Sequence, residues 1–220
     1  MKVTGMLSET GWIAVLVCLC APATMPLHAQ SSQGQAAVRG LTGSAVYAIA
    51  GGAETPLHVG TMLPIGSTIK TGPGSAADLS FGATAGVVRL LQNSMLSLEK
   101  FDATDPRPGA PVELRLNLLE GTMAGFGQKA PSNSKYRVKV SRGVADVGGA
   151  KYRISADGYL VLLEGTALFA FVPASGEPVP FELRAPAPVY FSPVEGVRPA
   201  PAELEREVLF QTKGQLKGKR

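Results

Sequence analysis

The sequence predicts an all-β fold: a β-solenoid-like stack of short strands, with a β-sandwich as the alternative and a short helix at the C-terminus. Glycine and proline are frequent, with 26 and 17 of the 220 residues. Between them, short runs of alternating apolar residues recur about every ten residues as far as Val172, which is typical of β-sandwiches, barrels and solenoids. The sequence Leu-Leu-Glu-Gly-Thr occurs twice, and this repeat favours the solenoid.

The first 29 residues resemble a secretory signal peptide. Lys2 precedes an apolar run at residues 11–21, and Leu27-His28-Ala29 has the small final residue of a cleavage site. The apolar run is shorter than the ~20 residues of a membrane span. We therefore expect cleavage after Ala29 and a periplasmic or secreted protein, with an uncleaved membrane anchor as the alternative.

Removal of residues 1–29 leaves few groups for catalysis or metal binding. Both cysteines, Cys18 and Cys20, lie in the apolar run, and His58 is the one histidine that remains. This composition excludes Cys/His zinc clusters, redox Cys-X-X-Cys motifs and cysteine nucleophiles. We expect no cofactor and no metal.

The positive charge of the chain is concentrated at its end. Residues 30–212 contain 16 acidic and 16 basic residues, and the surplus comes from Lys213, Lys217, Lys219 and Arg220. A neutral body without a basic face interleaved with aromatic residues argues against nucleic-acid binding. The basic tail is expected to be solvated, with weak contact to anionic lipid or polysaccharide as the alternative.

The expected organisation of the remaining chain follows from its turn residues. We predict a flexible lead-in at residues 30–43, an all-β domain at 44–172, a proline-rich edge or capping segment at 173–198, and a short helix with a basic tail at 199–220. Within the domain, residues 102–111 (DATDPRPGAP) are expected to form an exposed loop. The expected strands lie at 44–50, within 56–81, and around 87–90, 95–98, 112–126, 135–140, 144–147, 152–155 and 158–171.

The repeated motif occupies residues 118–122 and again residues 162–166. In both copies we expect one strand to run into Glu-Gly, turn, and leave as a second strand. Between the copies, residues 135–140 alternate so that their basic side chains face outward, and Asp157-Gly158 is a favoured hairpin turn.

Several short pieces in a fixed order carry a family resemblance. The pieces are Pro56-Leu57, Val59-Gly60, Gly66–Thr71, Ser75–Leu79, Asn93–Leu96, Leu119–Gly121 and Leu163–Gly165. Together they resemble the FecR domain over residues 46–171. That family includes the periplasmic halves of iron-dicitrate-type sigma-factor regulators and many exported stand-alone proteins.

The chain departs from the family pattern in two places. Gly82–Gly86 replaces the usual Asp-Gly turn, and Val147-Gly148-Gly149-Ala150 replaces the usual Val-Arg-Gly-Thr. The chain also shows no cytoplasmic anti-sigma segment, so the resemblance does not extend to sigma-factor control.

For each residue with a reactive side chain, the sequence context favours a structural role over a catalytic one. His58 lies between Leu57 and Val59 in a strand-like run, where an edge histidine is a better interpretation than a general base. Glu120 and Glu164 hold equivalent places in the repeat, so we expect each to accept backbone amides at its own turn rather than to form a glycosidase pair. We assign no catalytic, cofactor, metal or binding residue.

The function expected from these observations is non-enzymatic. The FecR resemblance implies a module for protein recognition, signalling or scaffolding in the bacterial cell envelope, with an envelope protein as its partner. A glycan-binding envelope protein is the alternative. Its aromatic platform would be drawn from Tyr47, Tyr136, Tyr152 and Tyr159, provided that three of them share an exposed face.

Overall fold

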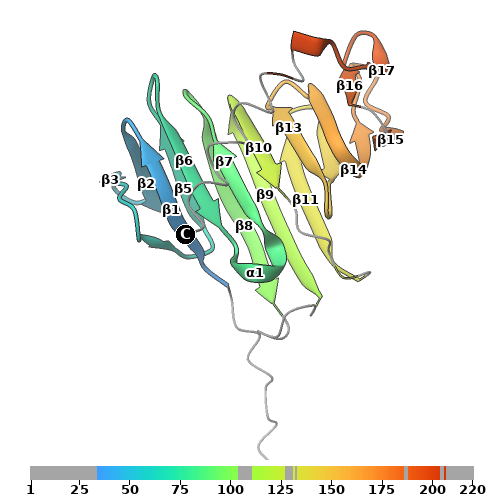
Figure 1. Cartoon of the computed structure of the whole chain (residues 1–220). Coiled ribbons are helices and arrows are strands. Elements are labelled where there is room, and N and C mark those ends of the chain that lie inside the picture. Colours follow the sequence, from blue (N-terminus) through green and yellow to red (C-terminus); the bar gives the residue numbers. More distant parts are fainter. Residues whose placement is uncertain are drawn as a thin grey trace, which may run out of the picture. The chain divides into compact units, whose positions relative to one another are not determined.

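The structure is a computed structural model that describes residues 34–103, 111–126, 131, 133–185, 188–203 and 206. For residues 83 and 84 it describes the backbone alone. Contacts separate the chain into residues 1–30 and residues 31–220, and all described residues lie in the second unit. They form 17 strands and one helical turn, α1 (Gly82–Ala85), so the all-β prediction is confirmed (Figure 1). The expected signal peptide lies outside the described residues.

Backbone pairing arranges the strands in two ladders. Ladder A contains, in order of pairing, β3 (Thr55–Pro56), β2 (Ala45–Ile49), β5 (Ser67–Thr71), β8 (Met95–Ala103), β9 (Val112–Glu120), β11 (Lys135–Val140), β12 (Gly143–Asp146), the second half of β14 (Leu160–Phe171) and β15 (Val179–Ala185). Ladder B contains β4 (Met62–Leu63), β1 (Ala36–Thr42), β6 (Ala76–Ser80), β7 (Val87–Leu90), β10 (Thr122–Phe126), β13 (Lys151–Ser155), the first half of β14, β16 (Val189–Ser192) and β17 (Gly196–Pro199). Because β14 belongs to both ladders, the two are continuous.

The chain advances along both ladders in nearly the order of its sequence. It forms an antiparallel pair in one ladder and then crosses to the other, as when the β6–β7 pair of ladder B is followed by the β8–β9 pair of ladder A. The pairings among described strands are antiparallel except for β9 with β11, which is parallel. The solenoid-like stack and its sandwich alternative stay predictions.

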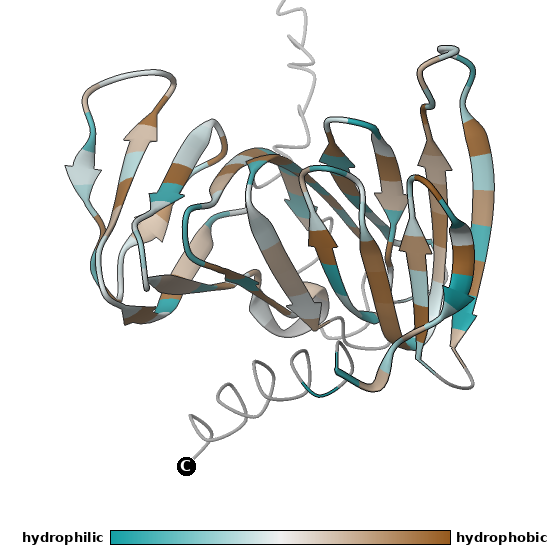
Figure 2. Ribbon diagram, turned by 90° about the horizontal axis from the view of Figure 1, so that it is seen from above, coloured by the Kyte–Doolittle hydropathy of each residue, from teal (hydrophilic) through white to brown (hydrophobic). Residues whose placement is uncertain are grey.

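Both ladders contribute side chains to one hydrophobic core. Ile69 and Leu96 of ladder A and Leu79 and Leu90 of ladder B are fully buried in the same cluster. Hydrophobic and hydrophilic residues alternate along the strands (Figure 2), as expected when one face of each strand packs inward. This alternation is the pattern that predicted the strands from the sequence.

Strand β1 corrects the expected flexible lead-in at residues 30–43. Residues 36–42 of that segment pair with β4 and β6, and Ala36 and Val38 are almost completely buried. Ala36 and Val38 have small side chains, which give only a weak apolar signal in the sequence. Both nevertheless belong to the hydrophobic core.

The two Glu-Gly motifs also differ from expectation. They are not hairpins, because β9 lies in ladder A and β10 in ladder B, while β14 passes from ladder B to ladder A at Gly165. Each motif is a corner at which the chain changes ladders. The φ angles of 76° at Gly121 and 92° at Gly165 lie in the left-handed region that favours glycine.

Other expectations agree with the structure. The hairpin at Asp157-Gly158 joins β13 to β14, and the basic residues of β11 face outward while its apolar residues are buried. The expected C-terminal helix stays a prediction: Ala202, Glu203 and Arg206 have helical backbone, Pro199 belongs to β17, and residues 204, 205 and 207–220 lie outside the described residues. No helix in the described part is long and apolar enough to cross a membrane.

Candidate interaction surfaces

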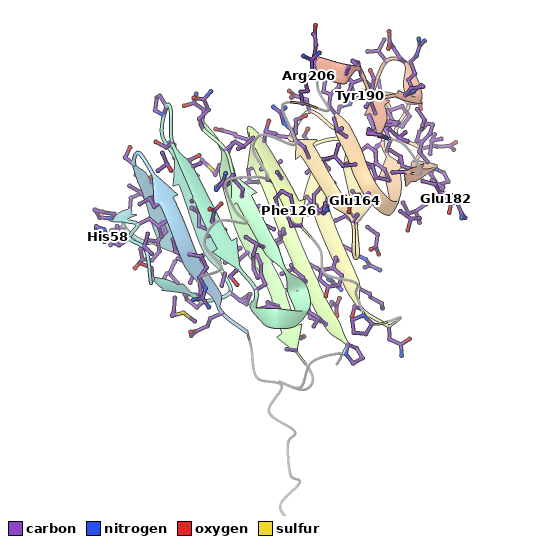
Figure 3. The ribbon with its side chains drawn as sticks, viewed as in Figure 1. His58, Phe126, Glu164, Glu182, Tyr190 and Arg206 are labelled. Carbon is purple, nitrogen blue, oxygen red and sulfur yellow. The ribbon has the colours of Figure 1, made fainter. Side chains whose placement is uncertain are left out.

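His58 has no partner for acid–base catalysis among the described residues. Its side chain is exposed in the connection between β3 and β4, and its carbonyl oxygen accepts a hydrogen bond from the Thr61 amide at 3.2 Å. It lies at the β3 end of the molecule, opposite Glu182 on β15 (Figure 3). This position agrees with the interpretation as an exposed histidine at the edge of the sheet.

Glu120 and Glu164 do not converge. Glu164 lies beside Lys151, which pairs with Phe126 at one end of β10, whereas Glu120 precedes the other end. The length of β10 puts the two glutamates about 13 Å apart along the strand direction, beyond the span of a glycosidase pair.

The expectation that these glutamates accept backbone amides is wrong. The Glu164 carboxylate accepts a hydrogen bond from Lys151 Nζ at 2.6 Å, and neither glutamate accepts a backbone amide in the described part of the chain. Ser94 holds the corner at Gly121 instead, because its hydroxyl accepts a hydrogen bond from the Thr122 amide at 2.9 Å.

The four tyrosines considered for glycan binding do not share an exposed face. Tyr136 and Tyr152 are buried in the core, where burial raises the pKa of both hydroxyls, and Tyr47 packs against the same core. Tyr159 is exposed and stacks on Tyr190, with ring centroids 6.0 Å apart. The glycan alternative therefore lacks the aromatic platform on which it depended.

A shallow polar groove lies where three corners meet. It has a volume of about 460 Å³ and is lined by residues that include Gly74, Gln92, Asn93, Thr122 and Arg153. Hydrogen bonds tie its lining to the neighbouring strands: Thr71 Oγ1 accepts the Ser94 amide at 3.1 Å, and the Ser94 hydroxyl accepts the Thr122 amide at 2.9 Å. In the described part of the chain no group of three His, Cys, Asp or Glu residues is placed to bind a metal ion.

The outer face of ladder A carries an excess of basic side chains on β11. We call Lys135, Arg137 and Lys139 the β11 cation row; they occupy alternate positions, with Lys135 and Lys139 exposed. On β9, which pairs with β11, Glu113 contacts Lys100 Nζ at 2.7 Å and Arg115 Nη2 at 2.5 Å. The hydrogen bond from Lys100 is the main cause of the lowered pKa of Glu113.

An apolar patch lies next to the β11 cation row. It consists of Val144, Leu168, Ala170 and Pro180, on β12, β14 and β15. Val144 pairs with Ala170 and Ala170 with Pro180, and the exposed fractions of Val144 and Leu168 are 38% and 53%. The patch reaches β15, which pairs with β14 alone among the described strands.

Comparison with known protein families identifies the domain. A sequence model of the FecR protein family matches residues 67–168. The resemblance to the FecR domain is confirmed over these residues. The match begins with β5 and ends within β14, so it includes the β11 cation row and two residues of the apolar patch, Val144 and Leu168. No curated protein matches the chain.

Proposed function

We propose that this protein is an exported, non-enzymatic FecR module that recognises a protein partner in the bacterial cell envelope for signalling or scaffolding. The FecR domain supports a signalling or regulatory role. Export to the periplasm or cell exterior rests on the signal-peptide pattern of residues 1–29, and the absence of cysteine after Cys20 is compatible with it.

The apolar patch is the observation that carries this proposal. Single exposed apolar residues are common on protein surfaces, but here four adjacent positions on three paired strands are apolar. Apolar area of this kind contributes to the centres of protein interfaces. Because the sheet holds the side chains in place, little conformational freedom is lost when a partner binds.

The winding of the chain supports a solenoid-like interpretation of the domain. Strand order in each ladder follows the sequence almost without exception, so successive segments stack on their predecessors. In a solenoid, such stacking creates an extended face for binding. We propose that the outer face of ladder A serves in this way.

Quantitative affinity capture tests the proposed function. The full chain with an affinity tag is expressed in its native cell, and proteins recovered with it are measured by mass spectrometry for Leu168→Glu and for Val194→Glu. Val194 is 85% exposed and lies outside the patch. We expect Leu168→Glu to reduce recovery of the specific partner about tenfold, since the charge must be desolvated on binding, and Val194→Glu to leave it unchanged. Equal recovery with both variants would contradict the proposal.

A further inference from the structure

The β11 cation row has a regular spacing. Its three side chains lie on one face of an extended strand, so neighbouring members are about 6.7 Å apart along the strand. Another extended chain lying alongside would present its own alternate side chains at the same spacing. The row is therefore matched in geometry to an extended polypeptide.

The row keeps an excess of positive charge although two acids face it in register, Glu113 opposite Lys135 and Asp146 opposite Arg137. On one side, Glu113 is engaged by Lys100 and Arg115, and Arg115 pairs directly with Arg137 across the strands. Like charges in this position are unfavourable. On the other side Asp146 pairs in register with Arg137, but their side chains form no ion pair in the described structure.

The row is continuous with the apolar patch. Lys139 pairs with Val144, which pairs with Ala170, and these residues share the outer face of ladder A. A partner lying across this face would meet cations over β11 and, over β12 and β14, apolar side chains together with Asp146. Charge complementarity thus requires acidic groups opposite β11 and apolar groups beside them.

We propose that the partner docks through an extended, acidic protein segment, with carboxylates at alternate positions over the β11 cation row and apolar side chains on the apolar patch. This inference rests on the proposed function and specifies the chemistry of the partner. The segment's carboxylates relieve the repulsion between Arg115 and Arg137. Its apolar residues cover Val144 and Leu168.

Fluorescence anisotropy with short labelled peptides tests the inference on the full chain. In one peptide Glu alternates with Ser, and in its control Gln alternates with Ser, so that all the Glu side chains can face the row. We expect the Glu peptide to bind about tenfold more tightly at low ionic strength, and the difference to disappear in ~1 M salt, where charges are screened within about 3 Å. Equal binding of the two peptides would overturn the inference.

Matched variants locate the binding. One triple variant removes the positive charges of the row: Lys135→Gln/Arg137→Gln/Lys139→Gln. The control removes the same charge from exposed positions on β1, β5 and β17: Arg39→Gln/Lys70→Gln/Arg198→Gln. We expect the first to lose the preference for the Glu peptide and the second to retain it. Equal loss in both would show a general charge effect and overturn the inference.

Two further outcomes separate this inference from its alternatives. If the row is required for binding to vesicles of phosphatidylglycerol but not to the Glu peptide, the face binds lipid and the inference fails. If the row variant still captures in the cell the partner that Leu168→Glu loses, the acidic segment is wrong and the proposed function stands.

Discussion

Gly121 shows how one residue holds a corner between the ladders. Its φ angle is 76°, and a Cβ atom there would lie 2.1 Å from Ser94 Oγ and 2.5 Å from the Asn93 carbonyl oxygen. Gly66 has a similar φ of 87°, but a Cβ atom would meet no other atom within 4 Å. Comparing alanine substitutions at the two glycines therefore separates the cost of backbone strain from the cost of steric overlap.

We expect Gly121→Ala to lower the free energy of unfolding by about 3 kcal/mol and Gly66→Ala by about 1 kcal/mol. Both substitutions strain the backbone, but the first also displaces Ser94 and breaks its hydrogen bond to Thr122. Urea unfolding followed by circular dichroism measures both values. Equal losses would mean that contact with Ser94 does not hold the corner.

At single residues the sequence predicted more about the core than about the surface. Apolar residues of the expected strands, such as Leu79 and Leu96, are buried. The sequence did not reveal that Val144 and Leu168 are exposed, because an apolar residue gives the same signal whether its face of the strand is covered or not. The apolar patch depends on which face of ladder A is left open, and that is a property of the assembled sheet.

The contact between Lys100 on β8 and Glu113 on β9 predicts that the stability of the protein depends on pH. The Lys100 hydrogen bond lowers the pKa of Glu113 from its ordinary value of 4.5 in the folded protein. This contribution to stability is therefore present above pH 4.5 and is lost as pH falls through the lowered pKa. We expect Glu113→Gln to be less stable than the parent near pH 7 and the difference to shrink as pH falls below 4.5.

Equilibrium unfolding over this pH range at low ionic strength provides the measurement, because salt screens exposed ion pairs. Glu99→Gln is the matched control, since Glu99 is an exposed neighbour on β8 that makes no ion pair with described residues. A pH-independent difference for Glu113→Gln would exclude the charge interaction as its cause.

Most strands were predictable as elements, but their assignment to ladders was not. Local alternation and turn residues predicted β2, β5, β6, β7 and β11, because these features lie within the element itself. A Glu-Gly corner and a hairpin turn look alike in sequence, and the difference depends on distant strands. The corner at Gly121, for example, is held by Ser94, 27 positions earlier in the chain.

At the scale of the whole molecule, pairing connects mainly neighbouring segments of the sequence. β5 contacts β2 and β8, and much later in the chain β14 contacts β12, β13, β15 and β16. No described pairing joins β1–β8 directly to β13–β17. Stability in such an arrangement is approximately a sum of local and nearest-neighbour contributions.

Phe191 provides a test of whether the stability of the two ends of the molecule is local. It is 1% exposed, and its ring centroid lies 4.9 Å from those of both Phe169 and Phe181. Phe191→Ala is expected to cost about 3–5 kcal/mol locally. Because β5–β8 make no direct pairing with this region, we expect their amides to retain hydrogen-exchange protection while those of β14–β16 lose it. Val194→Ala, at an exposed position, should change neither region. Uniform loss of protection in Phe191→Ala would instead show that both ladders unfold as one cooperative unit.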